Sequence, residues 1–363
     1  PAADIEEYFA DASVRASAAQ RIETLFKIVK GATKTVVMPA EALLNRTSPK
    51  DRLLESLTEI KPGDVFEPED LVKTLISRGY ELSDKAVGQG QFARRGGILD
   101  IFPVTWENPL RIEFWDDEID SLRLLDTETM RSLENLQSAV IFPAKEILPN
   151  EEEKAAAFKN INSEYEKTLK KMEKTENLKA AENLRANVGE ALEKFRKGGD
   201  FPRESLYADL LFGERSTVFG YFPPNTVIHF VEWGRIKERL SFVRDSFAEA
   251  AMSRAEAGFL LTSRVNALLT EEDVLRLAGN FPQTVFSFLR SSLPDFSFKA
   301  KVGFSVKAAA SFRSRADLFG QEVSYLKKEG YAVLVFTKSG TFAERIHNEL
   351  DEQGISSILC TKG

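Results

Sequence analysis

The sequence contains one cysteine and two histidines among its 363 residues, and these scarcities restrict its chemistry. The single Cys360 excludes an intrachain disulfide and a cysteine-rich metal cluster, as is typical of proteins in a reducing cytosol. His229 and His347 lie far apart in the chain, so they predict neither a histidine metal site nor a proton-relay pair. We therefore expect no metal site.

Long apolar runs and targeting signals are also missing. No run approaches the roughly 20 residues that a helix needs to cross a bilayer, and no signal peptide opens the chain. We expect a cytoplasmic protein without a membrane partner. A net charge of −7 argues against a uniformly basic nucleic-acid binder. The chain begins without methionine and ends on what resembles an incomplete strand, so we expect a piece of a longer protein.

The phosphate-binding loop G-x-x-x-x-G-K-[ST] is absent as well. This loop holds nucleotide phosphates with its backbone amides and an adjoining helix N-terminus. Without it, and without a recognisable nucleophile and base, we expect no catalytic residue and no cofactor-binding residue in this chain.

Hydrophobic spacing divides the chain into an α/β part and an antiparallel insert. Residues 13–30 have helical spacing, and residues 33–39 form a short β-branched run that predicts a strand. From residue 86 to 143, helical periodicity gives way to short runs separated by turns. The strand candidates there are 98–102, 110–115, 119–125 and 139–142.

Beyond the insert, helical and α/β patterns return. Residues 151–197 predict amphipathic helices whose alternating acids and bases form a solvated face. The stretch GYFPPNTVIHFVEWG (220–234) predicts a turn followed by a buried strand, and GNFPQTVFSFL (279–289) predicts a further short strand. Residues 319–360 predict a helix–strand–helix–strand series, as in a cut α/β domain.

The most informative strand is LRIEFW, residues 110–115. Alternation places Leu110, Ile112 and Phe114 on one face and Arg111, Glu113 and Trp115 on the other. Arginine and aromatic side chains are enriched at the centres of protein interfaces, where opposite charges set the register of a partner. The alternative is a cross-strand Arg–Glu pair beside a partly covered tryptophan. Asp116, Asp117 and Glu118, which follow, are typical acids of a turn rather than a metal cluster.

A second unusual feature is Arg94-Arg95-Gly96-Gly97, which precedes the strand at 98–102. Glycine tolerates backbone angles closed to other residues, so we expect the pair to turn the chain tightly into this strand. Arg95 would then lie at the rim of the small sheet beside the strand that carries Arg111. Arg94 has no assigned role.

These residues resemble a known family. FARRGGILDIFP, then RIEFWDDEIDSLRLLD and TMRS, are similar to the second domain of the nucleotide-excision-repair protein UvrB and of the transcription-repair coupling factors. The resemblance extends weakly over most of the chain. It implies a multidomain α/β protein: a UvrB-like α/β domain (1–61 and 144–305) interrupted by a small antiparallel β-rich UvrA-binding domain (62–143). The start of a third α/β domain (306–363) follows.

Departures from UvrB favour the N-terminal, UvrB-like part of the coupling factors. UvrB carries an Asp-Glu pair after its Tyr-Phe-Pro turn, whereas this chain has Val231-Glu232. Valine offers no oxygen ligand to Mg²⁺, and the DNA-probing hairpin of UvrB is not evident. The resemblance implies UvrA recruitment in transcription-coupled repair by a chain without enzymatic activity. RNA polymerase, double-stranded DNA, ATP and Mg²⁺ would be bound by other domains of an ATP-dependent translocase.

The resemblance also implies roles for single residues. Arg95 and Arg111 would pair with carboxylates on UvrA, Glu113 and Asp117 with basic groups, and Trp115 would be the buried aromatic anchor. We expect Arg95→Ala combined with Arg111→Ala to abolish UvrA binding without changing the thermal melt. Two other readings stay open: a piece of the damage-verifying ATPase UvrB, and an α/β protein whose arginines bind DNA phosphates.

Overall fold

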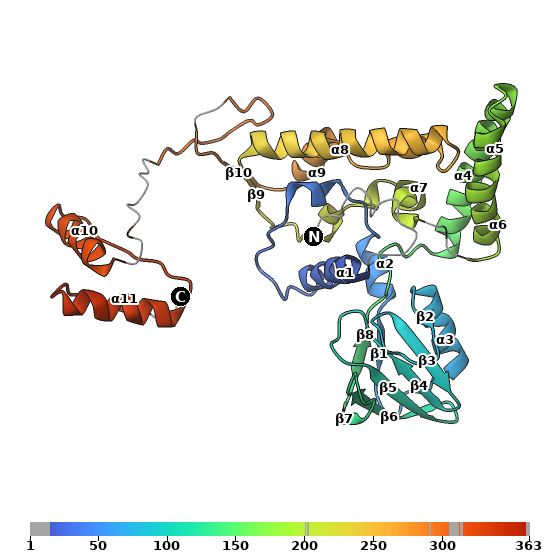
Figure 1. Ribbon diagram of the computed structural model, residues 1–363, viewed down its shortest axis with the longest axis horizontal. Coiled ribbons are helices and arrows are strands. Elements are labelled where there is room, and N and C mark those ends of the chain that lie inside the picture. The colour runs from blue at the N-terminus through green and yellow to red at the C-terminus, as the bar shows by residue number, and fades with distance from the viewer. Residues whose placement is uncertain are drawn as a thin grey trace. The chain divides into compact units, whose positions relative to one another are not determined.

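The computed structural model describes residues 15–199, 201, 203–289, 292–304, 312 and 315–360. The chain divides into two compact units, Pro1–Leu293 and Pro294–Gly363 (Figure 1). The fold is mixed α/β with an antiparallel β-rich sheet, as predicted from the sequence. Within the described ranges, no helix is both long and apolar enough to span a membrane.

The predicted insert contains a six-stranded sheet in the order β2-β3-β4-β5-β6-β7. Only β2 and β3 pair in parallel, and the other neighbours are antiparallel. The strands are β2 (Glu81–Leu82), β3 (Gln91–Arg95), β4 (Ile98–Ile101), β5 (Leu110–Trp115), β6 (Glu118–Leu125) and β7 (Ser132–Asn135). The predicted strands at 98–102, 110–115 and 119–125 are thus confirmed within a residue or two. The arginine pair is itself in a strand, so Gly96-Gly97 forms the turn of a β3–β4 hairpin.

One face of this sheet packs against helix α3 (Pro68–Ser77). Leu71 and Leu75 of α3 share a buried cluster with Phe92, Leu99 and Ile112 of the sheet. Burial of each such side chain contributes about 1.5–3 kcal/mol. Because side chains alternate along a strand, the residues between these positions project from the opposite face. That opposite face is named the outer face below.

A two-stranded ribbon leads into and out of the region that holds the sheet. β1 (Thr58–Ile60) pairs antiparallel with β8 (Ala139–Ile141), which confirms the strand predicted at 139–142. Ile60 and Ile141 are buried, and the Tyr80 hydroxyl donates to the backbone oxygen of Phe142 at 2.7 Å. These contacts join both ends of the small sheet to the same core.

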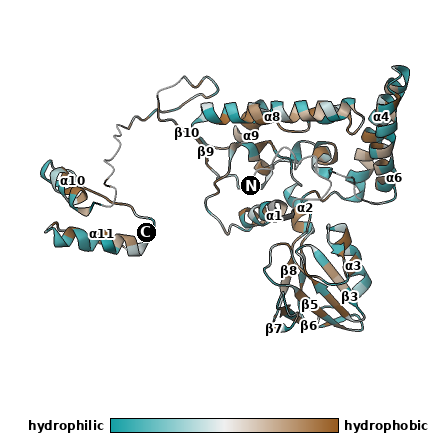
Figure 2. Ribbon diagram, viewed as in Figure 1, coloured by the Kyte–Doolittle hydropathy of each residue, from teal (hydrophilic) through white to brown (hydrophobic). Residues whose placement is uncertain are grey.

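The rest of the first unit is mainly helical. Its helices are α1 (Arg15–Val29), α2 (Lys50–Glu55), α4 (Glu151–Lys174), α5 (Leu178–Leu184), α6 (Glu190–Arg196), α7 (Ala208–Phe212), α8 (Trp233–Glu256) and α9 (Glu271–Ala278). Asn150 and Glu153 form a capping box at the start of α4. Figure 2 shows α4 and α8 alternating between hydrophilic and hydrophobic residues, as expected for helices with one buried face.

A second, smaller sheet pairs β9 (Ile228–Val231) in parallel with β10 (Gln283–Phe286). The sequence predicted a buried strand at β9, and this is wrong in part: Phe230 is buried, but His229 and Val231 are exposed. The segment 33–39, also predicted as a strand, is not one in the structure. Its β-branched residues suit a strand, but a strand requires hydrogen bonds to a neighbour, which local composition does not supply.

The second unit contains α10 (Ala316–Lys328) and α11 (Gly340–Glu352). Both predicted helices of the 319–360 series are therefore present. The two segments predicted as strands between and after them are not strands in the described part of the chain. The Lys327 ammonium donates to the backbone oxygen of Ser356 at 2.9 Å, which ties the last segment to α10. The predicted domain boundaries at 61/62, 143/144 and 305/306 remain predictions.

Candidate docking surface

The strand register defines which side chains share the outer face. Residues directly opposite in antiparallel strands project to the same side. One row across the sheet contains Arg95, Ile98, Glu113 and Ser121, and the next contains Ala93, Asp100, Arg111 and Arg123. The predicted alternation in β5 is confirmed on both sides, since Leu110 and Ile112 are fully buried. Arg111, Glu113 and Trp115 therefore lie on the outer face.

Arg111 forms a bidentate ion pair with Asp100 on the neighbouring strand. Its Nε and Nη2 atoms donate to the two carboxylate oxygens at 2.7 and 2.8 Å. Asp100 is buried, and its hydrogen bond raises the pKa of the Arg111 guanidinium. Arg111 pairs with Asp100 because the two lie directly opposite each other. The cross-strand Arg–Glu pair considered from the sequence forms instead between Glu113 and Arg123. A single acid within the apolar strand ILDI was the overlooked signal for the Arg111–Asp100 pair.

Glu113 has its own partners within the sheet. Its carboxylate accepts from the Ser121 hydroxyl at 2.8 Å and pairs with Arg123 at 2.9 Å. Arg111 and Arg123 lie opposite each other, so Asp100 and Glu113 offset what would otherwise be a repulsion between like charges. The sequence reasoning missed Arg123 because the β5–β6 register brings it into place. The centre of the outer face is thus a charge-balanced network that holds its side chains in position.

The two adjacent arginines of β3 project to opposite faces. Arg95 is exposed on the outer face, where its guanidinium donates to the backbone oxygen of Asp84 at 2.8 Å. The sequence predicted that Arg95 would lie beside the strand that carries Arg111. This is wrong, because β4 separates β3 from β5. Arg94, left without a role, pairs with Glu69 of α3 at 2.7 Å and lowers the pKa of that carboxyl. Among the described residues, Arg95 thus has no carboxylate partner, whereas Arg94 is paired with Glu69.

Trp115 stands at the exposed end of β5. It is 80% exposed, more than the other large apolar side chains of the sheet that are exposed, Leu82 and Leu133. The turn that follows begins at Asp116, whose φ of 59° lies in the left-handed region. Half-buried Asp117 has its backbone oxygen bound to the amide of Phe66 at 2.7 Å. The tryptophan is therefore held on a rigid hairpin next to a run of acids.

Gly97 connects the β3–β4 hairpin, which carries Arg95, to the β5–β6 hairpin, which carries Trp115, at one end of the sheet. The Phe114 amide donates to the Gly97 oxygen at 2.8 Å. A Cβ atom on Gly97 would lie 3.0 Å from the Phe114 oxygen, so a larger residue would push the strands apart. Gly96 has a φ of +58°, which suits glycine. The glycine pair therefore closes the turn and fixes Arg95 at the same end as Trp115.

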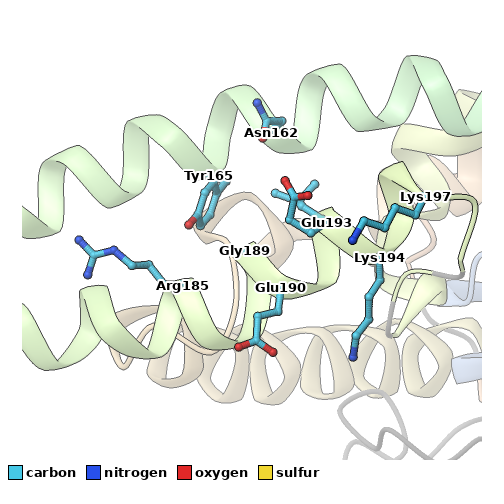
Figure 3. Close-up of a pocket in the computed structure, with 9 residues that line it drawn as sticks. Asn162, Tyr165, Arg185, Gly189, Glu190, Glu193, Lys194 and Lys197 are labelled. Atoms are coloured by element: carbon cyan, nitrogen blue, oxygen red, sulfur yellow. The ribbon is translucent and has the colours of Figure 1, made fainter.

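A pocket of about 520 Å³ lies between α4 and the segment from Arg185 to Lys197. Figure 3 shows Asn162 and Tyr165 on one helix facing residues of the other. Its lining carries charges of both signs, and two of them are in ion pairs: Arg185 with Glu173, and Glu193 with Arg196. Tyr165 fits closely because Gly189 opposite has no side chain. Nothing in this lining selects one class of ligand, so the outer face is the better candidate for the functional site.

The sequence places Val231-Glu232 where UvrB carries its Asp-Glu pair, and in the structure Val231 ends β9 and Glu232 precedes α8. Val231 is exposed at the end of β9. Glu232, with a φ of 58°, accepts a hydrogen bond from the Phe288 amide at 2.6 Å. Among the described residues, no group of His, Cys, Asp and Glu is arranged to hold a metal ion. The one remaining acid of the pair therefore holds the chain after β10.

Comparison with known proteins agrees with this geometry. Residues 58–147 match the UvrB interaction domain family, a range that contains the whole six-stranded sheet and the β1–β8 ribbon. The chain is 29% identical over 353 residues to the transcription-repair-coupling factor of Bacillus subtilis (strain 168), which covers 94% of this chain. It is 28% identical to that of Staphylococcus aureus (strain MRSA252), covering 93% of this chain.

The chain spans 28% of the length of each of these relatives. The predicted resemblance is confirmed, and the similarity favours the coupling factors over UvrB.

Proposed function

We propose that this chain, which carries a UvrB interaction domain and is similar to transcription-repair-coupling factors over most of its length, recruits UvrA. The outer face of the six-stranded sheet would be the docking surface. The observation that carries this proposal is Trp115, 80% exposed on a rigid hairpin beside charges of both signs. Tryptophan and arginine are enriched among the few residues that carry most of the binding energy in protein interfaces.

The proposed contacts fall into two groups, according to whether the side chain already forms an ion pair within the described part of the chain. Trp115 would enter a pocket on UvrA, and Arg95 would pair with a carboxylate there. Asp117 would face basic groups. Arg111 and Glu113 are already paired with Asp100 and Arg123, so they would contribute their remaining donors and acceptors from fixed positions. Such preorganisation lowers the entropy lost on association.

The wider role follows from similarity alone and belongs to the proposal. A longer protein of this kind would couple stalled transcription to nucleotide excision repair in the cytoplasm. Its other domains would bind RNA polymerase and double-stranded DNA and would use ATP and Mg²⁺ for translocation. The part described here would contain no catalytic residue, cofactor or metal, and would act by binding.

Arg95 and Arg94 offer a matched test of the docking face. We expect Arg95→Ala to weaken UvrA binding about tenfold, because it removes a charge at the rim of the interface. The loss should shrink as salt rises, since salt screens exposed charges. Arg94→Ala removes the same side chain one residue away, on the face toward α3, and should leave the affinity unchanged. The measurement is a titration of UvrA by calorimetry at two salt concentrations.

Equal losses for the two variants would mean that the face has been assigned wrongly. ATP hydrolysis and DNA binding by the unaltered chain are measured alongside. Salt-sensitive DNA binding that falls with Arg95→Ala would favour contact with phosphates instead.

A further inference from the structure

The outer face is wider than strands β2 to β7, because the segment before α3 pairs with the start of β6. The Gly63 amide donates to the Ile119 oxygen at 2.8 Å, and the Ile119 amide donates to the Asp64 oxygen at 2.9 Å. Val65 and Glu118 form an antiparallel bridge. Residues 63–66 therefore act as one more short edge strand, beside the end of β6 that follows the Asp116 turn.

This pairing places Val65 in line with Trp115. Trp115 lies opposite Glu118 on one side, and Val65 lies opposite Glu118 on the other. Opposite residues share a face, so the three form a row across the outer face, named the tip row here. The neighbouring Phe66 and Phe114 pack against the buried core, which agrees with the alternation. Val65 is 67% exposed, so the row contains two open apolar side chains around one carboxylate.

The surroundings of the tip row are acidic. Asp116, Asp117 and Asp120 lie within two residues of Glu118 in the chain. None of these four carboxylates forms an ion pair with a described residue, unlike Asp100 and Glu113 farther along the sheet. Arg95 is exposed at the same end of the sheet, so these four carboxylates are balanced only in part within the described chain. A partner that covers the row must bring cations of its own, since buried unpaired carboxylates are costly.

We propose that the tip row is part of the UvrA contact, with Val65 as a second apolar contact and Glu118 as the charge that selects a basic rim. This rests on the proposed function. The matching surface on UvrA would be an apolar depression that receives Trp115 and Val65, bordered by lysine or arginine. Val65 lies 50 residues before Trp115 and outside the motif that suggested docking, so only the edge pairing connects the two.

The test compares three variants of the full chain in UvrA titrations. Val65→Ala removes exposed apolar surface, and we expect about a fivefold to tenfold loss of affinity. Glu118→Lys reverses the charge within the row and should weaken binding by about tenfold or more, with the deficit relieved by added salt. Val37→Ala is the control, since Val37 is 93% exposed but lies outside the sheet. Circular dichroism checks that each variant is folded, as expected for exposed positions.

The outcomes separate this inference from the proposal beneath it. Weaker binding by Val65→Ala and Glu118→Lys, with Val37→Ala unchanged, supports the tip row. Unchanged affinity in both tip-row variants, while Trp115→Ala reduces binding, overturns the tip row and leaves the docking proposal standing. Absence of UvrA binding by the unaltered chain overturns both.

Discussion

Replacement of Trp115 by alanine is expected to lower the affinity for UvrA about 100-fold and to leave thermal unfolding unchanged. The indole is 80% exposed in the free chain, so its removal costs the fold little. In the complex, the same side chain would lose its contact with water. Truncating a central aromatic anchor typically costs 2 kcal/mol or more, and about 2.7 kcal/mol corresponds to 100-fold.

Two further variants make the result specific to the outer face. Trp115→Phe keeps an aromatic ring on the same hairpin and should recover part of the lost affinity. Phe242→Ala removes an aromatic side chain that is exposed on α8 and should have no effect. Dissociation rates measured by surface plasmon resonance would report the change, because lost interface contacts act mainly on dissociation. Equal affinity for Trp115→Ala and the unaltered chain would rule out the anchor.

Replacement of Arg111 by alanine is expected to destabilise the sheet, by about 2–3 kcal/mol. Breaking a buried ion pair costs about 3–5 kcal/mol because one charge stays behind unpaired. Here the estimate is reduced because the Arg111 side chain is partly exposed, while Asp100 is buried. The expectation that Arg95→Ala with Arg111→Ala leaves the thermal melt unchanged therefore no longer holds. Of these two substitutions, only Arg95→Ala tests docking without also destabilising the sheet.

A double-variant cycle separates the pair from its surroundings. Asp100→Ala with Arg111→Ala removes both charges and should unfold at a higher urea concentration than Arg111→Ala alone, since no carboxylate is left unpaired. Arg111→Lys keeps the charge but loses the bidentate hydrogen bonding, so its stability should lie between those of Arg111→Ala and the unaltered chain. Urea unfolding followed by circular dichroism measures all three. A single Arg111→Ala variant as stable as the unaltered chain would show that the pair contributes nothing to the sheet.

Several features of this protein follow from local sequence. Alternation in LRIEFW is enough to separate Leu110 and Ile112 from Arg111 and Trp115, because strand geometry sends successive side chains to opposite faces. Gly96-Gly97 predicts a tight turn, since glycine tolerates the backbone angles found there. The helical patterns predicted at 13–30 and 151–197 follow from spacing for the same reason, because periodicity is a property of neighbouring residues.

Pairing between distant segments could not be predicted in this way. Which acid meets Arg111, which strand separates it from Arg95, and why Val65 lies beside Glu118 all depend on sheet order and register. The run at 33–39 has strand-like composition but is not a strand, for want of a partner. Side-chain alternation is encoded residue by residue, whereas hydrogen bonds between strands depend on which segments the whole fold brings together. The sequence by itself determined which side chains face outward. Only the tertiary structure decided which of them are paired and which stay open to a partner.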